Sequence, residues 1–342
     1  MRLVSGAWWL SRGATAAGLL VLSGCESADS GAAHAAGLRA DLPPAAGVRS
    51  IPTRLPAGLS EASAVVRSAT RPDVLFTIND SGHEPRLFAL DTAGSARGQW
   101  RIRDARNRDW EAASSGPCGP PAGPAAGPAC LYIGDVGDNR EARRNRTVYR
   151  LIEPRVDAQA ATSALAARSL TFRYADGPHD VEAMYVGPGG TIYLITKRPR
   201  LDRHRRQRPS LVFALDPAAW LRPDSVAVAR LIDSLPIVPG SAPGRLVTDA
   251  ALAPDGRHVA VRTYGEVFVF AADSGSGRIR MDVPPSVCSV MELGERQGEG
   301  VTWLDSSGRL LLMSEGRREP LHVYACPLPP ARGTEPDRPT AR

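Results

Sequence analysis

Acidic residues recur at the start of five short apolar segments of this 342-residue chain. The segments are LSEASAVV from residue 59, DWEAA from 109, DVEAMYV from 180, VTDAALA from 247 and QGEGVTWL from 297. In each segment one acid precedes alanine or glycine, and these acids are Glu61, Glu111, Glu182, Asp249 and Glu299. A lone carboxylate among apolar neighbours is costly to bury. We therefore expect the five acids to share one site.

Further apolar segments with the alternating pattern of β-strands follow each acid. After Glu182, for example, IYLITKR begins at 192, LVFALDP at 211 and AVARLIDSLP at 227. Turn sequences such as GPGG, APDGR and DSSGR separate first from second strands. Four strands in a unit of roughly 40 to 50 residues are typical of a β-propeller blade. The sequence thus predicts an all-β fold, a β-propeller with five blades favoured and six as the alternative.

The N-terminal part of the repeat region indicates how the ring closes. The fifth unit ends after its third strand, near Pro327, and lacks a fourth. Residues 47–56, GVRSIPTRLP, precede Glu61 as fourth strands precede the other acids. We expect this N-terminal strand to complete the last blade and remove its exposed edge. The predicted propeller covers residues 47–330, and residues 331–342 form a disordered tail; a sixth blade would lie within residues 182–249.

In a propeller the first strand of each blade lines the central channel, so equivalent acids meet at one mouth. Asp109 and Asp180 stand two residues before Glu111 and Glu182, on the same strand face, and enlarge the cluster. Crowded carboxylates raise each other's pKa or bind a cation, and Ca2+ takes roughly 6 to 8 oxygen ligands. Calcium is the expected cofactor. The predicted metal ligands are Glu61, Asp109, Glu111, Asp180, Glu182, Asp249 and Glu299.

The second strands deliver more polar residues to the same mouth. Their mixed charges suit either a salt-bridged plug or a site for a small anionic ligand, and recurring polar residues can also bridge blades without a ligand. The predicted ligand-binding residues are Asn79, Asp80, Asp135, Lys197, Arg262, Tyr264 and Glu315.

The first 25 residues have the features of a bacterial export signal. Arg2 and Arg12 flank the n-region, an apolar stretch follows, and Leu-Ser-Gly-Cys resembles a lipobox ending at Cys25. An acyl chain on this cysteine would hold the protein on a membrane surface. We expect a signal peptide over residues 1–24, lipidation of Cys25 and a flexible tether over residues 25–46. The protein would be exported and membrane-anchored, periplasmic or at the cell surface.

Four cysteines remain, and an even number in an exported protein predicts two disulfides. Cys118 and Cys130 bracket the loop GPPAGPAAGPA, which favours that pair and leaves Cys288 with Cys326; two other pairings stay open.

The formal net charge is +6, and positive charge is concentrated in KRPRLDRHRRQR, residues 197–208. Outside the cytoplasm nucleic acid is not an expected partner. This loop is therefore either a solvated surface or a contact for a polyanionic surface.

No nucleophile elbow, Walker loop, His-Glu-x-x-His motif or dinucleotide fingerprint occurs. The sequence thus leaves open whether the protein is an enzyme.

Two units share a longer run: LSEASAVV, LFTINDSG and RLFALD in one, and DVEAMYV, IYLITKR and LVFALD in the other. This run resembles the secreted bacterial β-propellers of the phytase-like and esterase-like-phytase group, over about residues 47–327. The resemblance implies central acids that hold calcium and, in true phytases, phosphate.

We therefore expect a monomeric propeller lipoprotein whose acidic mouth binds a ligand, a cation or an envelope partner. The alternative is a calcium-dependent phosphoester hydrolase in which Lys197 or Arg262 counters the charge of phosphate.

Overall fold

A computed structural model describes residues 47–119, 128–156, 161–197, 201–202, 204 and 206–329. The predicted signal peptide, Cys25, the tether and the C-terminal tail lie outside the described residues, as do parts of the 118–130 and 197–208 loops. Within the described part, no helix has the length and the apolar composition that a membrane span requires.

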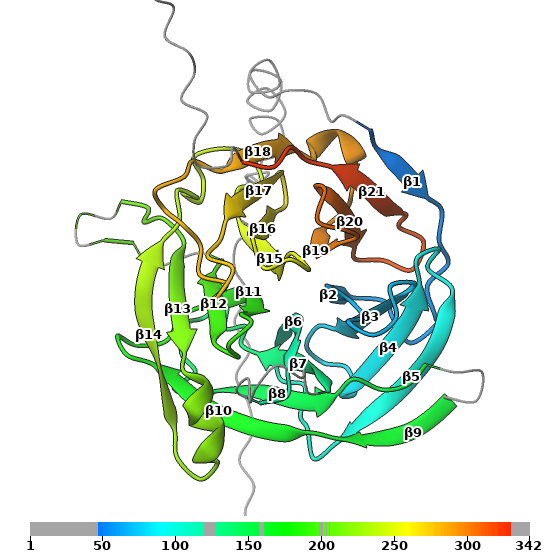
Figure 1. The fold of residues 1–342 in the computed structure, drawn as a ribbon, viewed down its shortest axis with the longest axis horizontal. Helices are drawn as coiled ribbons and strands as arrows, with labels where there is room; N and C mark the ends of the chain where they lie inside the picture. Colours follow the sequence, from blue (N-terminus) through cyan, green and yellow to red (C-terminus); the bar gives the residue numbers. More distant parts are fainter. Residues whose placement is uncertain are drawn as a thin grey trace, which may run out of the picture.

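The described residues form five four-stranded blades around one axis, as the sequence favoured (Figure 1). The innermost strands are β2 (Ala62–Arg67), β6 (Trp110–Pro117), β11 (Val181–Val186), β15 (Val247–Leu252) and β19 (Gly298–Trp303). The second strands are β3 (Val74–Asn79), β7 (Ala129–Asp135), β12 (Ile192–Thr196), β16 (His258–Thr263) and β20 (Arg309–Ser314). The third strands are β4 (Arg86–Asp91), β8 (Arg146–Ile152), β13 (Leu211–Leu215), β17 (Glu266–Ala271) and β21 (Leu321–Ala325).

The outermost strands are β5 (Ala96–Arg103), β10 (Arg168–Tyr174), β14 (Ala227–Ser234), β18 (Ser286–Ser289) and β1 (Arg49–Ile51). Two short 3-10 helices, η1 (Pro217–Leu221) and η2 (Met291–Leu293), lie in connections of the third and fourth blades. Residues 182–249 belong to the third blade and its connection to the fourth, so they contain no sixth blade.

Burial explains why the strands differ in sequence pattern. Each of the five hydrophobic cores lies between two neighbouring blades, so both faces of an innermost strand pack against protein. The strands β11 and β19 are accordingly buried at every position. The outer strand β5 alternates between exposed and buried residues toward its end, because only one face meets a core.

The N-terminal strand closes the ring, as predicted. Strand β1 pairs antiparallel with β21, from Arg49 opposite Val323 to Ile51 opposite Leu321. Ser50 Oγ and His322 Nδ1, 2.9 Å apart, add a side-chain hydrogen bond to this junction. Because β1 covers the edge of β21, the last blade has the same four strands as the others.

A continuous segment, residues 161–174, ties three blades together on the outside of the ring (Figure 1). Its first part, β9 (Ala161–Ala166), adds a fifth strand to the first blade by pairing parallel with β5. Its second part, β10, pairs with β8 of its own blade and with β14 of the third. We call β9 and β10 the belt; the sequence predicted β10 but not β9.

The strand directions define two faces of the ring. Innermost strands begin at the mouth face, where the connections between blades and between second and third strands also lie. They end at the far face, which carries the other two connections of each blade. Strand β1 begins and β21 ends at the far face, so the chain continues from both described ends on that side.

Both predicted disulfides are present. Cys118 and Cys130 close the loop between β6 and β7, and Cys288 joins Cys326 at a sequence separation of 38. Cys288 lies in the outer strand of the fourth blade and Cys326 directly follows the third strand of the fifth. The second disulfide therefore links two blades, whereas the first links two strands of one blade.

We expect the inter-blade disulfide to stabilise the fold more than the loop disulfide. Replacing Cys288 and Cys326 by alanine should lower the free energy of unfolding by about 4 kcal/mol, since the closed loop is long. Replacing Cys118 and Cys130 should lower it by about 3 kcal/mol. Urea denaturation of the two double variants measures both values, and a larger loss for the Cys118–Cys130 pair would contradict the expectation.

Candidate cation site at the channel mouth

Each innermost strand contains a β-bulge at the same place, one residue into the strand. The residues at the bulges are Ser63, Glu111, Glu182, Thr248 and Glu299. A bulge inserts an extra residue and re-aims its side chain relative to a regular strand. The five bulge positions therefore carry three carboxylates and two hydroxyls, and not the five equivalent carboxylates that the sequence predicted.

The expected equivalence fails at Glu61 and Asp249. Glu61 precedes its bulge by two residues and is exposed, with Oε2 3.4 Å from His83 Nδ1. Asp249 follows its bulge by one residue and is completely buried, where its carboxylate accepts hydrogen bonds from the N–H groups of Ala250 and Val301 at 2.8 Å each. Glu61 and Asp249 stand in sequence motifs similar to those of the other three acids, but the strand register places them at other positions relative to the bulge. Their role as metal ligands stays a prediction.

The two hydroxyl residues at bulges connect neighbouring blades. Ser63 Oγ donates to the carbonyl of Trp110 at 2.7 Å, and Thr248 Oγ1 donates to the carbonyl of Gly298 at 3.0 Å. Both carbonyls belong to the residue just before the glutamate of the next blade. These bonds hold the backbone beside Glu111 and Glu299 in place.

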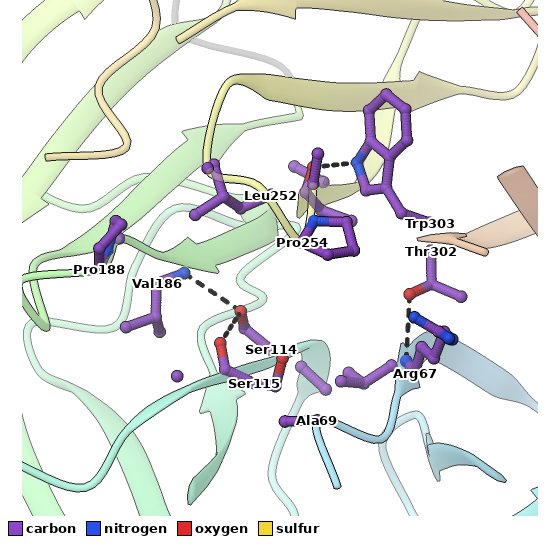
Figure 2. A pocket seen from close by; sticks show the side chains of 18 of the residues that line it. Arg67, Ala69, Ser114, Ser115, Val186, Pro188, Leu252, Pro254, Thr302 and Trp303 are labelled. Atoms are coloured by element: carbon purple, nitrogen blue, oxygen red, sulfur yellow. Dashed lines mark hydrogen bonds between the residues drawn. The ribbon is translucent and has the colours of Figure 1, made fainter. Parts of the chain in front are cut away.

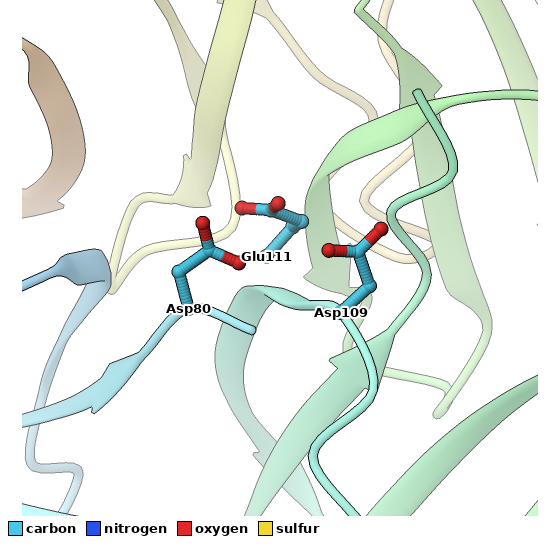
Figure 3. Close-up of side chains that lie close together, drawn as sticks. All are labelled: Asp80, Asp109 and Glu111. Carbon is cyan, nitrogen blue, oxygen red and sulfur yellow. The ribbon is translucent and has the colours of Figure 1, made fainter. Parts of the chain in front are cut away.

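Three carboxylates from two blades lie together at the mouth (Figure 3). Asp80 follows β3, Asp109 precedes β6, and Glu111 is a bulge residue of β6. One oxygen of each side chain lies within 4.8 Å of the others. We call these three residues the acid cluster. Of the predicted metal ligands it contains Asp109 and Glu111, and it adds Asp80, which the sequence placed among the ligand-binding residues.

Asn107 positions the two loops that carry the acid cluster. Its Nδ2 donates to the carbonyls of Asn79 at 3.0 Å and Asp80 at 2.7 Å, while its Oδ1 accepts from the N–H of Trp110 at 3.1 Å. This side chain therefore joins the turn after β3 to the start of β6. The sequence does not single out Asn107, because nothing in the repeat marks a residue that bridges two blades.

Gly137 allows a third loop to approach the acid cluster. A Cβ at this position would lie 2.6 Å from Glu111 Cγ and 2.7 Å from Asp109 Oδ2, which is too close for any other residue. The carbonyl of Asp109 also accepts the N–H groups of Val136 and Gly137. The acid cluster is thus enclosed on this side by backbone.

Burial and like charges raise the pKa values of the acid cluster. Glu111 is 6 % exposed, and burial, followed by the charges of Glu182 and Asp80, raises its pKa well above the ordinary value. Burial and Asp80 raise the pKa of Asp109 to about 6, against the opposing effect of Arg143. Among the described residues, none donates a hydrogen bond to the Glu111 carboxylate or forms an ion pair with the acid cluster.

The other two glutamates at bulges have partners. Lys197, the only lysine of the chain, donates to Glu182 Oε2 at 2.8 Å and lies 5.3 Å from the centre of the Tyr264 ring. Burial lowers the pKa of Lys197, but Glu182 and Tyr264 more than offset this effect, so the pKa is raised overall. Tyr264 donates to Glu299 Oε1 at 3.1 Å.

Gln297 extends this network to the last blade. Its Nε2 donates to Glu299 Oε1 at 2.8 Å and to Glu315 Oε1 at 2.9 Å. The other oxygen of Glu299, Oε2, is buried and has no hydrogen-bond partner among the described residues. Burial, followed by the charges of Glu299 and Asp80, raises the pKa of Glu315 to about 7. Gln297 occupies the position of Asp109 relative to the bulge, two residues before the glutamate.

The remaining predicted residues of the mouth have structural contacts. Asp180 Oδ1 accepts from the N–H of Asp138 at 2.9 Å, and Asp135 pairs with Arg143 at 2.6 Å. Asn79 Oδ1 accepts from the N–H groups of Ser60 and Glu61 at 3.2 Å each.

Arg262 lies beneath the mouth, completely buried, rather than at its surface. Its guanidinium donates to the carbonyls of Gly300 and Met313 and pairs with Glu295. The structure therefore brings Arg262 into a contact between two blades and does not bring it to the acid cluster.

The opposite end of the channel is chemically different. A cavity of about 550 Å³ opens there between the ends of all five innermost strands. Its lining is mostly small or apolar, with the hydroxyl groups of Ser114 and Thr302 bonded to backbone N–H groups of Val186 and Arg67 (Figure 2). The concentration of carboxylates is therefore a property of the mouth face only.

No family model matches the sequence, and neither does any curated protein. The resemblance to phytase-like propellers accordingly stays a prediction.

Solved structures resemble the fold at low identity. The allergen Mala s 1 from Malassezia sympodialis is 10 % identical, with a TM-score of 0.49 over 81 % of this chain and 95 % of the allergen. A luciferin-regenerating enzyme is 10 % identical, with a TM-score of 0.42 over 82 % and 95 % of the two chains. Virginiamycin B lyase from Staphylococcus aureus is 6 % identical, with a TM-score of 0.37, and the match spans 77 % of this chain and 66 % of the lyase. No functional argument rests on these similarities.

The raised pKa values predict that stability depends on pH when divalent cations are absent. Asp109 and Glu315 hold their protons more tightly in the folded protein than in the unfolded chain. Their contribution to stability is complete below about pH 4. It is lost as the pH rises through about 6 for Asp109 and about 7 for Glu315. From about pH 5 to about pH 8 we expect the Tm in chelator to fall by ~2–4 °C.

The double variant Asp109→Asn, Glu315→Gln should show a smaller fall over the same range, since neither amide titrates. Thermal unfolding of both proteins in the same buffers makes the comparison. An identical pH dependence of the two Tm curves would show that other groups cause it.

Proposed function

We propose that this protein is an exported, lipid-anchored β-propeller that binds a divalent cation, calcium, at its acid cluster. The observation that carries the proposal is a nearly buried carboxylate, Glu111, which receives no hydrogen bond from the described residues and lies against two further carboxylates. A buried carboxylate of this kind either takes up a proton or needs a counter-charge. A bound cation would supply it.

The distances between the carboxylate oxygens of the acid cluster suit a bound calcium ion. Ca2+ binds oxygen at about 2.4 Å, so two of its ligands lie up to about 4.8 Å apart. One carboxylate oxygen of each of the three residues lies within 4.8 Å of the other two. Calcium also takes ligands in flexible geometries and accepts water at open positions, which suits a site at a channel mouth.

Two basic residues whose side chains lie among the carboxylates of the mouth already pair with other acids. Lys197 pairs with Glu182, and Arg143 pairs with Asp135. Each pairing takes up the charge that could otherwise have neutralised the acid cluster. This supports an external cation as the missing charge.

We propose binding rather than phosphoester hydrolysis. In the hydrolase alternative Lys197 or Arg262 would counter the charge of phosphate, but Lys197 pairs with Glu182 and Arg262 is completely buried. Neither side chain is free to meet a phosphate at the mouth. The binding function needs only the acid cluster.

The two disulfides are those of a protein that folds in an oxidising compartment, which agrees with export. Lipidation of Cys25 is part of the proposal. The described chain begins on the far face, opposite to the acid cluster.

Calcium should raise the Tm of the purified protein relative to chelator. At a free calcium concentration of 100 times the Kd, the gain is about 2.7 kcal/mol. Glu111→Gln should remove the calcium-induced shift and raise the Tm in chelator, because the amide removes a buried charge from the repulsive cluster. Differential scanning fluorimetry with calcium and with chelator measures both effects.

Asp104→Asn is the matched control. Asp104 is exposed in the same loop, outside the acid cluster, and its φ of 59° suits asparagine as well as aspartate. This variant should keep the full calcium shift. A wild-type protein without any shift, or a Glu111→Gln variant that keeps it, would contradict the proposed function.

Cys25→Ser should move the protein from the membrane fraction to the soluble fraction, because the acyl chain is the proposed anchor. Fractionation of cells, together with incorporation of a labelled fatty acid, measures this change. Wild-type protein should carry the label and the variant should not. A Cys25→Ser protein that stays with the membrane would rule out the anchor.

A further inference from the structure

Exposed arginines surround the acid cluster on the mouth face. We call six of them the arginine rim: Arg106, Arg108, Arg140, Arg144, Arg317 and Arg318. They lie in three loops, one between the first and second blades, one between β7 and β8, and one between β20 and β21. The first loop also carries Asp109, and the second carries Gly137, which contacts the acid cluster.

None of the rim side chains forms an ion pair with a described residue, although the far face shows that such pairs form readily in this protein. There, the exposed Arg71, Arg97 and Arg309 each pair with a nearby aspartate, at 2.8, 3.1 and 3.4 Å. The arginine rim therefore presents six positive charges without ion-pair partners among the described residues, in three loops of the mouth face.

Arginine charge in this arrangement favours an anionic polymer as the partner. A guanidinium presents a fork of N–H donors that matches a carboxylate or phosphate group with two hydrogen bonds. Six such groups on separate loops can bind anionic groups that repeat along a chain. A single small anion could meet only one or two of them.

Other features of the protein distinguish between the possible classes of anionic partner. No exposed large apolar side chain lies in the three loops, so the surface lacks the apolar centre of a protein interface. Nucleic acid is not an expected partner for an exported protein with disulfides.

We propose that the arginine rim binds a carboxylated, anionic polysaccharide. The proposal goes beyond cation binding and does not depend on it, because the guanidinium contacts need no metal. Each proposal can therefore fail without the other. Polymer binding in chelator tests the arginine rim, and the calcium-induced shift of the Tm tests the acid cluster.

The probe is a fluorescently labelled oligosaccharide of alginate, which is a polymer of uronic acids. Anisotropy of the labelled probe with the purified protein in chelator should show saturable binding that weakens as salt rises. The variant Arg106→Ser, Arg108→Ser, Arg317→Ser, Arg318→Ser should bind about tenfold more weakly. An uncharged dextran oligosaccharide of the same length should not bind.

Two further variants make the test specific. Arg155→Ser, Arg222→Ser removes exposed arginines of the far face that form no ion pair with a described residue, and it should bind alginate like the wild type. Glu111→Gln should also bind alginate in chelator, whether or not it keeps the calcium shift. Equal affinity of the rim variant and the wild type would overturn the proposal, as would an equal loss in the far-face variant. Binding to phosphatidylglycerol vesicles without binding to alginate would replace the polysaccharide by a lipid surface.

Discussion

Carboxylates converge on the axis of this propeller, and the mouth is arranged around their mutual repulsion. Lys197 neutralises Glu182, while neutral donors, Tyr264 and Gln297, surround Glu299. The acid cluster receives no such partner from the described residues. The acid cluster, on the first two blades, therefore lacks the side-chain donors that serve Glu182 and Glu299, whereas Asp135 on the second blade pairs with Arg143. This contrast makes the acid cluster the candidate position for a cation.

The fold tolerates this repulsion because the ring is held closed elsewhere. Five cores lie between neighbouring blades, the N-terminal strand completes the last blade, and the belt joins three blades on the outside. The disulfide between Cys288 and Cys326 links the fourth blade to the fifth. Locally unfavourable charge at a binding site is commonly offset by stability in the rest of a fold.

The direction of the strands gives the two faces opposite properties. Polar residues that end second strands and start first strands gather at the mouth face, together with the arginine rim. The far face has paired arginines, a cavity lined mainly by small and apolar residues, and both described ends of the chain. The acid cluster and the described ends of the chain therefore lie on opposite faces, as the same topology requires.

The sequence by itself predicted the class of fold and the closing strand, and it favoured five blades and the observed disulfide pairs over the alternatives, because strand periodicity, repeat length and cysteine spacing are local or additive properties. It did not predict β9, whose pairing with another blade is non-local. It also could not place Asp80 beside Glu111, or separate Glu61 and Asp249 from the bulge residues. Those contacts depend on bulges and on Asn107, which bridges two loops. Only the tertiary structure decides them, because a shift of one residue in a strand changes where a side chain points.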